Sequence, residues 1–206
     1  SEMCIRDSDM SDYLTLTPAG VFHAFLHANA DDKAMALQAL LAEKVSIERL
    51  LWVQKYSEAT LAWALENGFV EVLSEPLVAP KMALDEFLPY VVASLSGSRK
   101  AAIASNEGFC LAKIGYSDEE ADTLAVAAAD FFDFVNRQEQ RGLNISGQAL
   151  SLFNEVDLIM PKISFVFLWI DGTGFVLILD GEPLTNNRAF VELVWAIKTS
   201  GLKFQG

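Results

Sequence analysis

Apolar residues in the first 80 positions recur mostly at the spacing of an α-helix, with short breaks between segments. This pattern predicts helices at about 18–28, 32–42, after Ser46 and after Ser57, with a short strand at 69–73. Ser46 and Ser57 are the expected N-caps, and Asn67-Gly68 is the expected helix stop. The residues expected to face inward are Leu37, Leu40, Leu41, Ile47, Leu50, Leu51, Leu61, Ala64 and Leu65. The first part of the chain is therefore predicted to be a mainly helical unit.

Beyond residue 82, helical and strand patterns alternate. The predicted elements are a helix ending at Gly97, strands at 100–105 and 109–114, a helix from Ser117 or Asp118 to about Arg141, strands at 148–156, 163–170 and 175–179, and a helix after Asn186 or Asn187. Asn106-Glu107-Gly108 and Asp171-Gly172-Thr173-Gly174 are hairpin turns, because Asn and Gly accept positive φ. The inward stripes are Leu88, Val91, Val92 and Leu95, then Ala121, Leu124, Ala125, Ala128, Phe132 and Val135, and finally Phe190, Leu193, Val194 and Ile197. The order α-β-β-α-β-β-β-α predicts an α+β fold.

The helical first part resembles a winged helix-turn-helix, so residues 10–80 are expected to form a winged-helix-like module. In that fold, the helix at 57–66 would be the one that reads DNA. It contains no Lys or Arg and has two glutamates, Glu58 and Glu66. The resemblance therefore implies a module that has lost DNA binding.

Two runs in the second part resemble the roadblock family. Residues 101–112 (AAIASNEGFCLA) look like its first hairpin, and residues 118–125 (DEEADTLA) look like the start of its central helix. The resemblance covers about 120 residues and makes 81–206 a roadblock-like domain. It implies a five-stranded antiparallel sheet with helices, dimers, and adaptor or regulatory roles around Ras-like small GTPases.

This resemblance also implies a dimer interface built from the central helix and the third strand of the domain. The interface residues it implies are Leu124, Ala128, Phe132, Leu150, Leu152 and Phe153. The sequence adds a reason of its own, since Leu150, Leu152 and Val156 alternate with polar residues. An exposed apolar strand edge promotes aggregation unless something pairs with it.

Composition narrows the classes of partner. The chain of 206 residues is 52% hydrophobic with a net charge of −13, which favours a packed core and disfavours nucleic acid or anionic membrane as partners. No apolar run reaches the roughly 18 residues of a membrane-spanning helix. Cys4 and Cys110 cannot form a disulfide framework, and the N-terminus lacks a signal-peptide pattern, so a cytoplasmic protein is expected. Residues 1–8 resemble a translated sequencing adapter, so 1–9 is expected to be a non-native leader.

The residues that could carry chemistry favour structural roles. His23 and His27 have the i, i+4 spacing of a metal pair but lack a third ligand. Cys110 lies in a predicted strand, and the acidic cluster from Asp118 to Asp122 falls in the first turns of a helix, where negative charge is favourable. No nucleophile or phosphate-loop motif is present. We therefore expect no enzyme activity, no cofactor and no metal.

Three tryptophans lie off the apolar stripes of their predicted helices. Trp52, Trp63 and Trp195 are therefore either packing residues between the two parts or contacts for an external partner. The favoured hypothesis is a homodimeric adaptor that binds a Ras-like small GTPase. The alternatives are a winged-helix transcriptional regulator and a small-molecule sensor domain.

Overall fold

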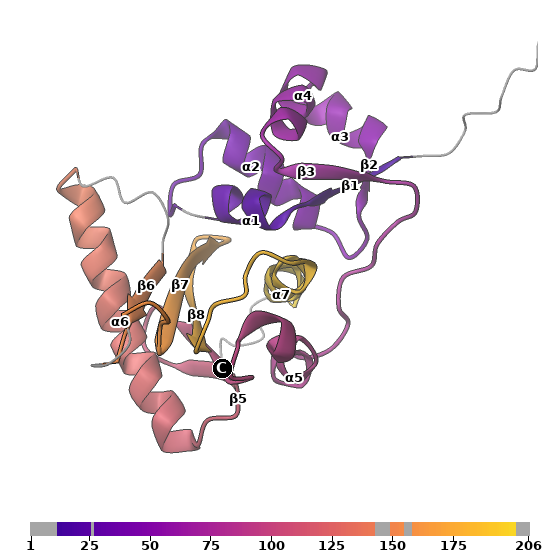
Figure 1. Ribbon diagram of the computed structural model, residues 1–206. Coiled ribbons are helices and arrows are strands. Elements are labelled where there is room, and N and C mark those ends of the chain that lie inside the picture. Colours follow the sequence, from indigo (N-terminus) through magenta and orange to yellow (C-terminus); the bar gives the residue numbers. More distant parts are fainter. Residues whose placement is uncertain (1–11, 26, 143–148, 155–157, 201–206) are drawn as a thin grey trace, which may run out of the picture.

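The computed structural model describes residues 12–25, 27–142, 149–154 and 158–200 (Figure 1). The expected leader at 1–9 lies outside these residues. The described chain is α+β with two antiparallel sheets, which confirms the predicted fold class.

The first part is built on a three-stranded sheet in the order β2-β1-β3. Its elements are β1 (Tyr13–Leu16), α1 (Pro18–Ala24), α2 (Asp32–Gln38), the 3₁₀ turn η1 (Ala39–Leu41), β2 (Ile47–Glu48), α3 (Arg49–Tyr56), α4 (Glu58–Glu66) and β3 (Val70–Leu73). The strands β1 and β2 have no counterpart among the elements predicted from the sequence. Each is short, and each exists because it pairs with a strand distant in sequence.

The start of α3 differs from the prediction. Ile47 and Glu48 pair with β1, so the helix begins at Arg49, and the Ser46 hydroxyl accepts from the Leu77 amide at 2.9 Å instead of capping it. The shift turns Leu50 and Leu51 outward, 71% and 55% exposed, so their predicted inward position is wrong. Leu65 of α4 is also exposed. The Ser57 cap is confirmed, since its hydroxyl accepts from the Thr60 amide at 3.3 Å.

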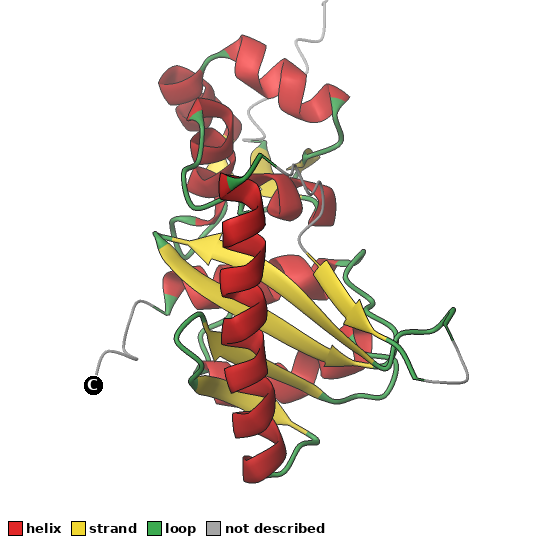
Figure 2. Cartoon of the chain, turned by 90° about the vertical axis from the view of Figure 1, so that its left-hand side faces the viewer, coloured by secondary structure: helices red, strands yellow, loops and turns green. Residues whose placement is uncertain are grey.

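The second part is a five-stranded antiparallel sheet in the order β5-β4-β8-β7-β6. Its elements are α5 (Leu84–Leu95), β4 (Ala101–Ser105), β5 (Cys110–Ile114), α6 (Asp118–Gln140), β6 (Ala149–Leu152), β7 (Ile163–Ile170), β8 (Thr173–Asp180) and α7 (Arg188–Thr199). The helix α6 crosses one face of this sheet (Figure 2). The described part of β6 is shorter than the predicted 148–156, although 148 and 155–157 lie outside the described residues.

Alternation along the strands divides the core between the two faces of the large sheet. Ala102, Ala104, Phe165 and Phe167 pack with α6, whereas their neighbours on the same strands pack into a cluster with α5 and α7. The three inner strands β4, β8 and β7 thus bury both faces. Phe132 of α6 fits against the sheet because residue 174 is glycine, where an added Cβ would lie 2.3 Å from the Phe132 ring.

One hydrophobic cluster joins the two parts of the chain. It runs from Leu14 in β1 to Ile197 in α7. The Phe22 and Phe190 rings lie 4.8 Å apart, and the Trp169 amide donates to the Phe25 carbonyl at 2.8 Å. The helix α7 is therefore covered by the large sheet and α5 on one side and by the first part of the chain on the other.

Candidate functional site

The strand β6 forms one edge of the large sheet. It pairs with β7 in the register Ala149↔Val166 to Leu152↔Ile163, and among the described strands it pairs with no other. The pairing is held further by the Lys162 amide, which donates to the Leu152 carbonyl at 2.8 Å. The outer edge of a strand carries backbone donors and acceptors that can pair with another chain.

An apolar surface lies beside this edge. Leu150 and Leu152 are opposite Phe165 and Ile163, both of which pack on the α6 side of the sheet. The Phe165 ring also contacts Phe131 of α6, with centroids 5.0 Å apart. The side of α6 that carries Phe131 and the β6 side chains Leu150 and Leu152 therefore lie on the same face of the sheet.

Part of this surface is exposed to solvent. The exposed fractions are 43% for Leu152, 43% for Phe153 and 44% for Phe134 of α6. Leu124, Phe131 and Leu150 are half-buried and pack against the cluster on the α6 side of the sheet. An open strand edge flanked by exposed apolar side chains has the composition of an interface core.

Two of the six implied interface residues are core residues. Ala128 and Phe132 are buried under α6, and the Phe132 ring packs against Phe167 and Trp169 with centroids 5.8 and 4.8 Å away. They cannot contact a second chain, because the same helical stripe already covers the sheet. Leu124, Leu150, Leu152 and Phe153 remain at the surface to different degrees.

The sequence analysis missed Phe134, because it lies outside the inward stripe of α6. A large apolar residue on the polar side of an otherwise regular amphipathic helix was the signal for it. Val126, 58% exposed on the same helix, gives the same signal.

Burial contradicts the partner-contact hypothesis for two of the three tryptophans. Trp52 is fully buried and its indole N–H donates to the Ala36 carbonyl at 3.0 Å. Trp195 is 2% exposed and donates to the Glu43 carbonyl at 2.8 Å, so it packs between the two parts of the chain. The helix α7 is buried on more sides than its apolar stripe indicates, whereas α3 buries the side that carries Trp52 in place of the predicted one. Trp63 is half-buried, with the Lys33 ammonium 4.3 Å above its ring.

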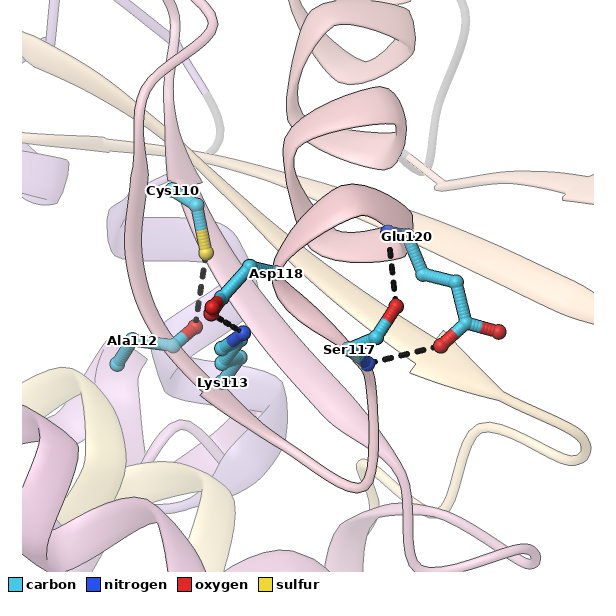
Figure 3. A network of polar contacts seen from close by, with 6 residues as sticks. All are labelled: Cys110, Ala112, Lys113, Ser117, Asp118 and Glu120. Carbon is cyan, nitrogen blue, oxygen red and sulfur yellow. Dashed lines mark hydrogen bonds and ion pairs between the residues drawn. The ribbon is translucent and has the colours of Figure 1, made fainter.

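The acidic start of α6 has a structural role (Figure 3). The Ser117 hydroxyl accepts from the Glu120 amide at 3.2 Å, and the Glu120 carboxylate accepts from the Ser117 amide at 2.8 Å, forming a capping box. Hydrogen bonding from the Ser117 amide, and next from the Ser117 side chain, lowers the pKa of the Glu120 carboxyl. Asp118 pairs with Lys113 of β5, and that bond lowers the pKa of Asp118.

The remaining candidates for chemistry are also accounted for by packing. Burial raises the pKa of the Cys110 thiol, which donates weakly to the Ala112 carbonyl at 3.6 Å, so the reactive thiolate is disfavoured. His23 stacks on Phe69 with centroids 4.5 Å apart, and His27 lies 3.5 Å from a Glu139 carboxylate oxygen. Within the described ranges, no three His, Cys, Asp or Glu side chains are grouped to hold a metal ion. None of the described helices is both long and apolar enough for a membrane span.

Comparisons with known proteins assign no family. No protein-family model matches the chain, and no curated protein matches it. Among solved structures, the chain is similar to a crystal structure of a Roadblock/LC7 domain from Streptomyces avermitilis, with 14% identity and a TM-score of 0.38. That match covers 59% of this chain and 93% of that domain.

Proposed function

We propose that this chain is a non-catalytic adaptor that forms a homodimer through β6 and binds a Ras-like small GTPase. The observation that supports the dimer is the open β6 edge with exposed Leu152 at its end and exposed Phe153 next in the chain, together with exposed Phe134 on α6. An isologous interface brings the same patch together from both copies. Antiparallel pairing of two β6 strands would satisfy the N–H and C=O groups on the outer edge of each strand. It would also bring the α6 helices of the two copies together.

The GTPase part of the proposal depends on the sequence resemblance of 101–112 and 118–125 to the roadblock family. The acidic chain, with a net charge of −13, adds complementarity to a basic patch on a partner. Complementary charge mainly accelerates encounter and selects partners, so apolar contacts would supply most of the affinity.

The test of the dimer is size-exclusion chromatography with light scattering on the parent chain and two leucine variants. Leu152→Asp places a charge within the proposed interface and should yield a monomer, since an unpaired buried charge is strongly unfavourable. Leu50→Asp is the matched control, because Leu50 is 71% exposed on α3, and it should remain a dimer. A monomeric parent chain, or a dimeric Leu152→Asp variant, contradicts the proposal.

Partner binding is tested by titrating small GTPases of the source organism, in the GDP and GTP-analogue states, into the parent chain. A preference for one state would give the direction of regulation, because a ligand shifts an equilibrium only by its differential affinity. If neither nucleotide state binds, the GTPase part of the proposal is wrong, and the dimer part still stands.

A further inference from the structure

The strand at the opposite edge of the large sheet, β5, has different surroundings from β6. Among the described strands it pairs with β4 alone, in the register Ala101↔Ile114 to Ala104↔Cys110. An open groove runs along this strand, lined by Asp85, Cys110, Leu111, Ala112, Lys113, Asp118 and Asp122.

The groove lies across the edge of the sheet and not on one face. Lys113 is opposite Ala102, which packs on the α6 side, whereas Ala112 is opposite Ile103, which packs on the side of α5 and α7. The groove has one acidic wall on each side of the sheet. Asp118 and Asp122 at the start of α6 form one wall, and Asp85 at the start of α5 forms the other. Figure 3 shows Asp118 and Lys113 together beside Cys110 on the α6 side. The backbone edge of β5 thus lies between two acidic walls.

The charge of the groove is negative on both sides. Lys113 is engaged by Asp118, which leaves Asp85 and Asp122 as exposed carboxylates on opposite walls. Further acidic residues, Glu86 and Glu119, occupy the same helix turns. In an added strand, successive side chains point to opposite faces, so two adjacent basic residues would reach both walls at once.

We propose that β5 is a docking edge for an extended, basic peptide segment of a partner protein. The segment adds to β5 as a sixth strand by backbone hydrogen bonds, and neighbouring Lys or Arg side chains pair with Asp85 on one wall and Asp122 on the other. This edge is distinct from β6, whose neighbours are apolar. A dimer formed through β6 would therefore carry one such edge at each end of its sheet.

The probe is a fluorescein-labelled, acetylated and amidated six-residue peptide with a central Lys-Arg pair flanked by Val and Thr. Fluorescence anisotropy should show saturable binding to the full chain that weakens as salt is raised. The same peptide with both central amides N-methylated should bind much more weakly, because one of these amides faces β5 and, once methylated, it can no longer donate and its methyl group obstructs the pairing. A peptide with a central Glu-Glu pair should not bind either.

The carboxylates are tested by the double variant Asp85→Asn with Asp122→Asn. Because this variant loses two exposed ion pairs with the peptide, its affinity for the Lys-Arg peptide should fall by about two- to thirtyfold. The matched control is Asp130→Asn with Glu66→Gln, which removes the same charge at exposed positions outside the groove and should bind like the parent. Thermal unfolding of each variant shows that the fold is retained.

Hydrogen exchange locates the bound peptide. Added peptide should slow exchange of the amides of residues 110–114 and leave residues 149–152 unchanged. Protection of β6 in place of β5, equal binding of the N-methylated peptide, or unchanged affinity of the groove variant would each overturn the proposal. Absence of binding by the Lys-Arg peptide overturns it too, and would mean that the acidic walls serve to keep other strands away from this edge.

Discussion

At the residue scale, His23 is the titratable side chain whose packing has the clearest consequence for pH dependence. Its ring stacks on Phe69 and lies 5.5 Å from the Trp63 ring, so α1, α4 and the residue before β3 meet around it. Burial lowers the pKa of His23 below its ordinary value of 6.5; the carboxylate of Asp31 opposes this shift, while His27 and Lys33 reinforce it. The uncharged imidazole is therefore the form that suits the folded chain.

The stability contributed by neutral His23 should be lost on acidification. Because its pKa is lower in the folded than in the unfolded chain, the unfolded chain binds more protons as pH falls through 6.5 and below. Denaturant titrations at pH 7.5 and pH 5.5 should show a smaller difference in unfolding free energy for His23→Phe than for the parent. His27→Gln is the control and should keep most of the His23 contribution, because burial and not His27 is the main cause of the lowered pKa of His23. An unchanged pH dependence in His23→Phe would refute this account.

At the element scale, the close approach of α1 to β3 depends on Gly20. A Cβ at this position would lie 2.0 Å from the Phe69 carbonyl oxygen, and that backbone atom cannot move aside without shifting β3. The same junction is held by Thr17, whose hydroxyl donates to the Gly68 carbonyl at 2.6 Å and accepts from the Gly20 amide at 3.1 Å. Thr17 thus both caps α1 and holds this helix to the residues that lead into β3.

Gly20→Ala should destabilise the chain by about 1–3 kcal/mol, the usual cost of forcing an extra atom into a packed site. This outweighs the gain of up to about 1 kcal/mol that alanine normally gives inside a helix. The measurement is the free energy of unfolding in urea. Ala19→Ser adds one atom at the exposed neighbouring position and should change it by less than about 1 kcal/mol. A Gly20→Ala variant more stable than the parent would show that α1 is free to move.

At the scale of the whole molecule, the shared cluster couples the two parts of the chain. The indole N–H of Trp195 in α7 donates to the Glu43 carbonyl in the first part. A core that continues across both parts favours a single cooperative unfolding transition.

Far-ultraviolet circular dichroism and tryptophan fluorescence should therefore report the same unfolding midpoint at a fixed protein concentration. Trp195→Phe removes the indole donor to the Glu43 carbonyl and should cost about 1–3 kcal/mol while keeping one transition. The control is Trp63→Phe, which replaces a half-buried indole whose neighbouring rings, His23 and Phe69, belong to the first part. Two separate transitions in the parent chain would show that the parts unfold independently.

The sequence by itself determined the elements whose signals are local. Apolar periodicity predicted the described helices and most strands, Ser117 and Ser57 marked helix starts, and glycine turns marked the hairpin between β7 and β8. These signals act over a few residues, because caps, turns and amphipathic stripes depend on neighbours in the chain. The residues of β6 that lie beside the open edge, Leu150 and Leu152, were found in the same way.

Only the tertiary structure decided what depends on partners far along the chain. The strand β1 forms by pairing with residues more than thirty positions away, and that pairing shifts α3 so that Leu50 turns outward and Trp52 inward. Burial of Trp195 follows from α7 lying between two layers, and the acidic groove exists because the starts of α5 and α6 meet at β5. Periodicity shows which side of an element is apolar. The packing of all elements together decides which surfaces remain uncovered.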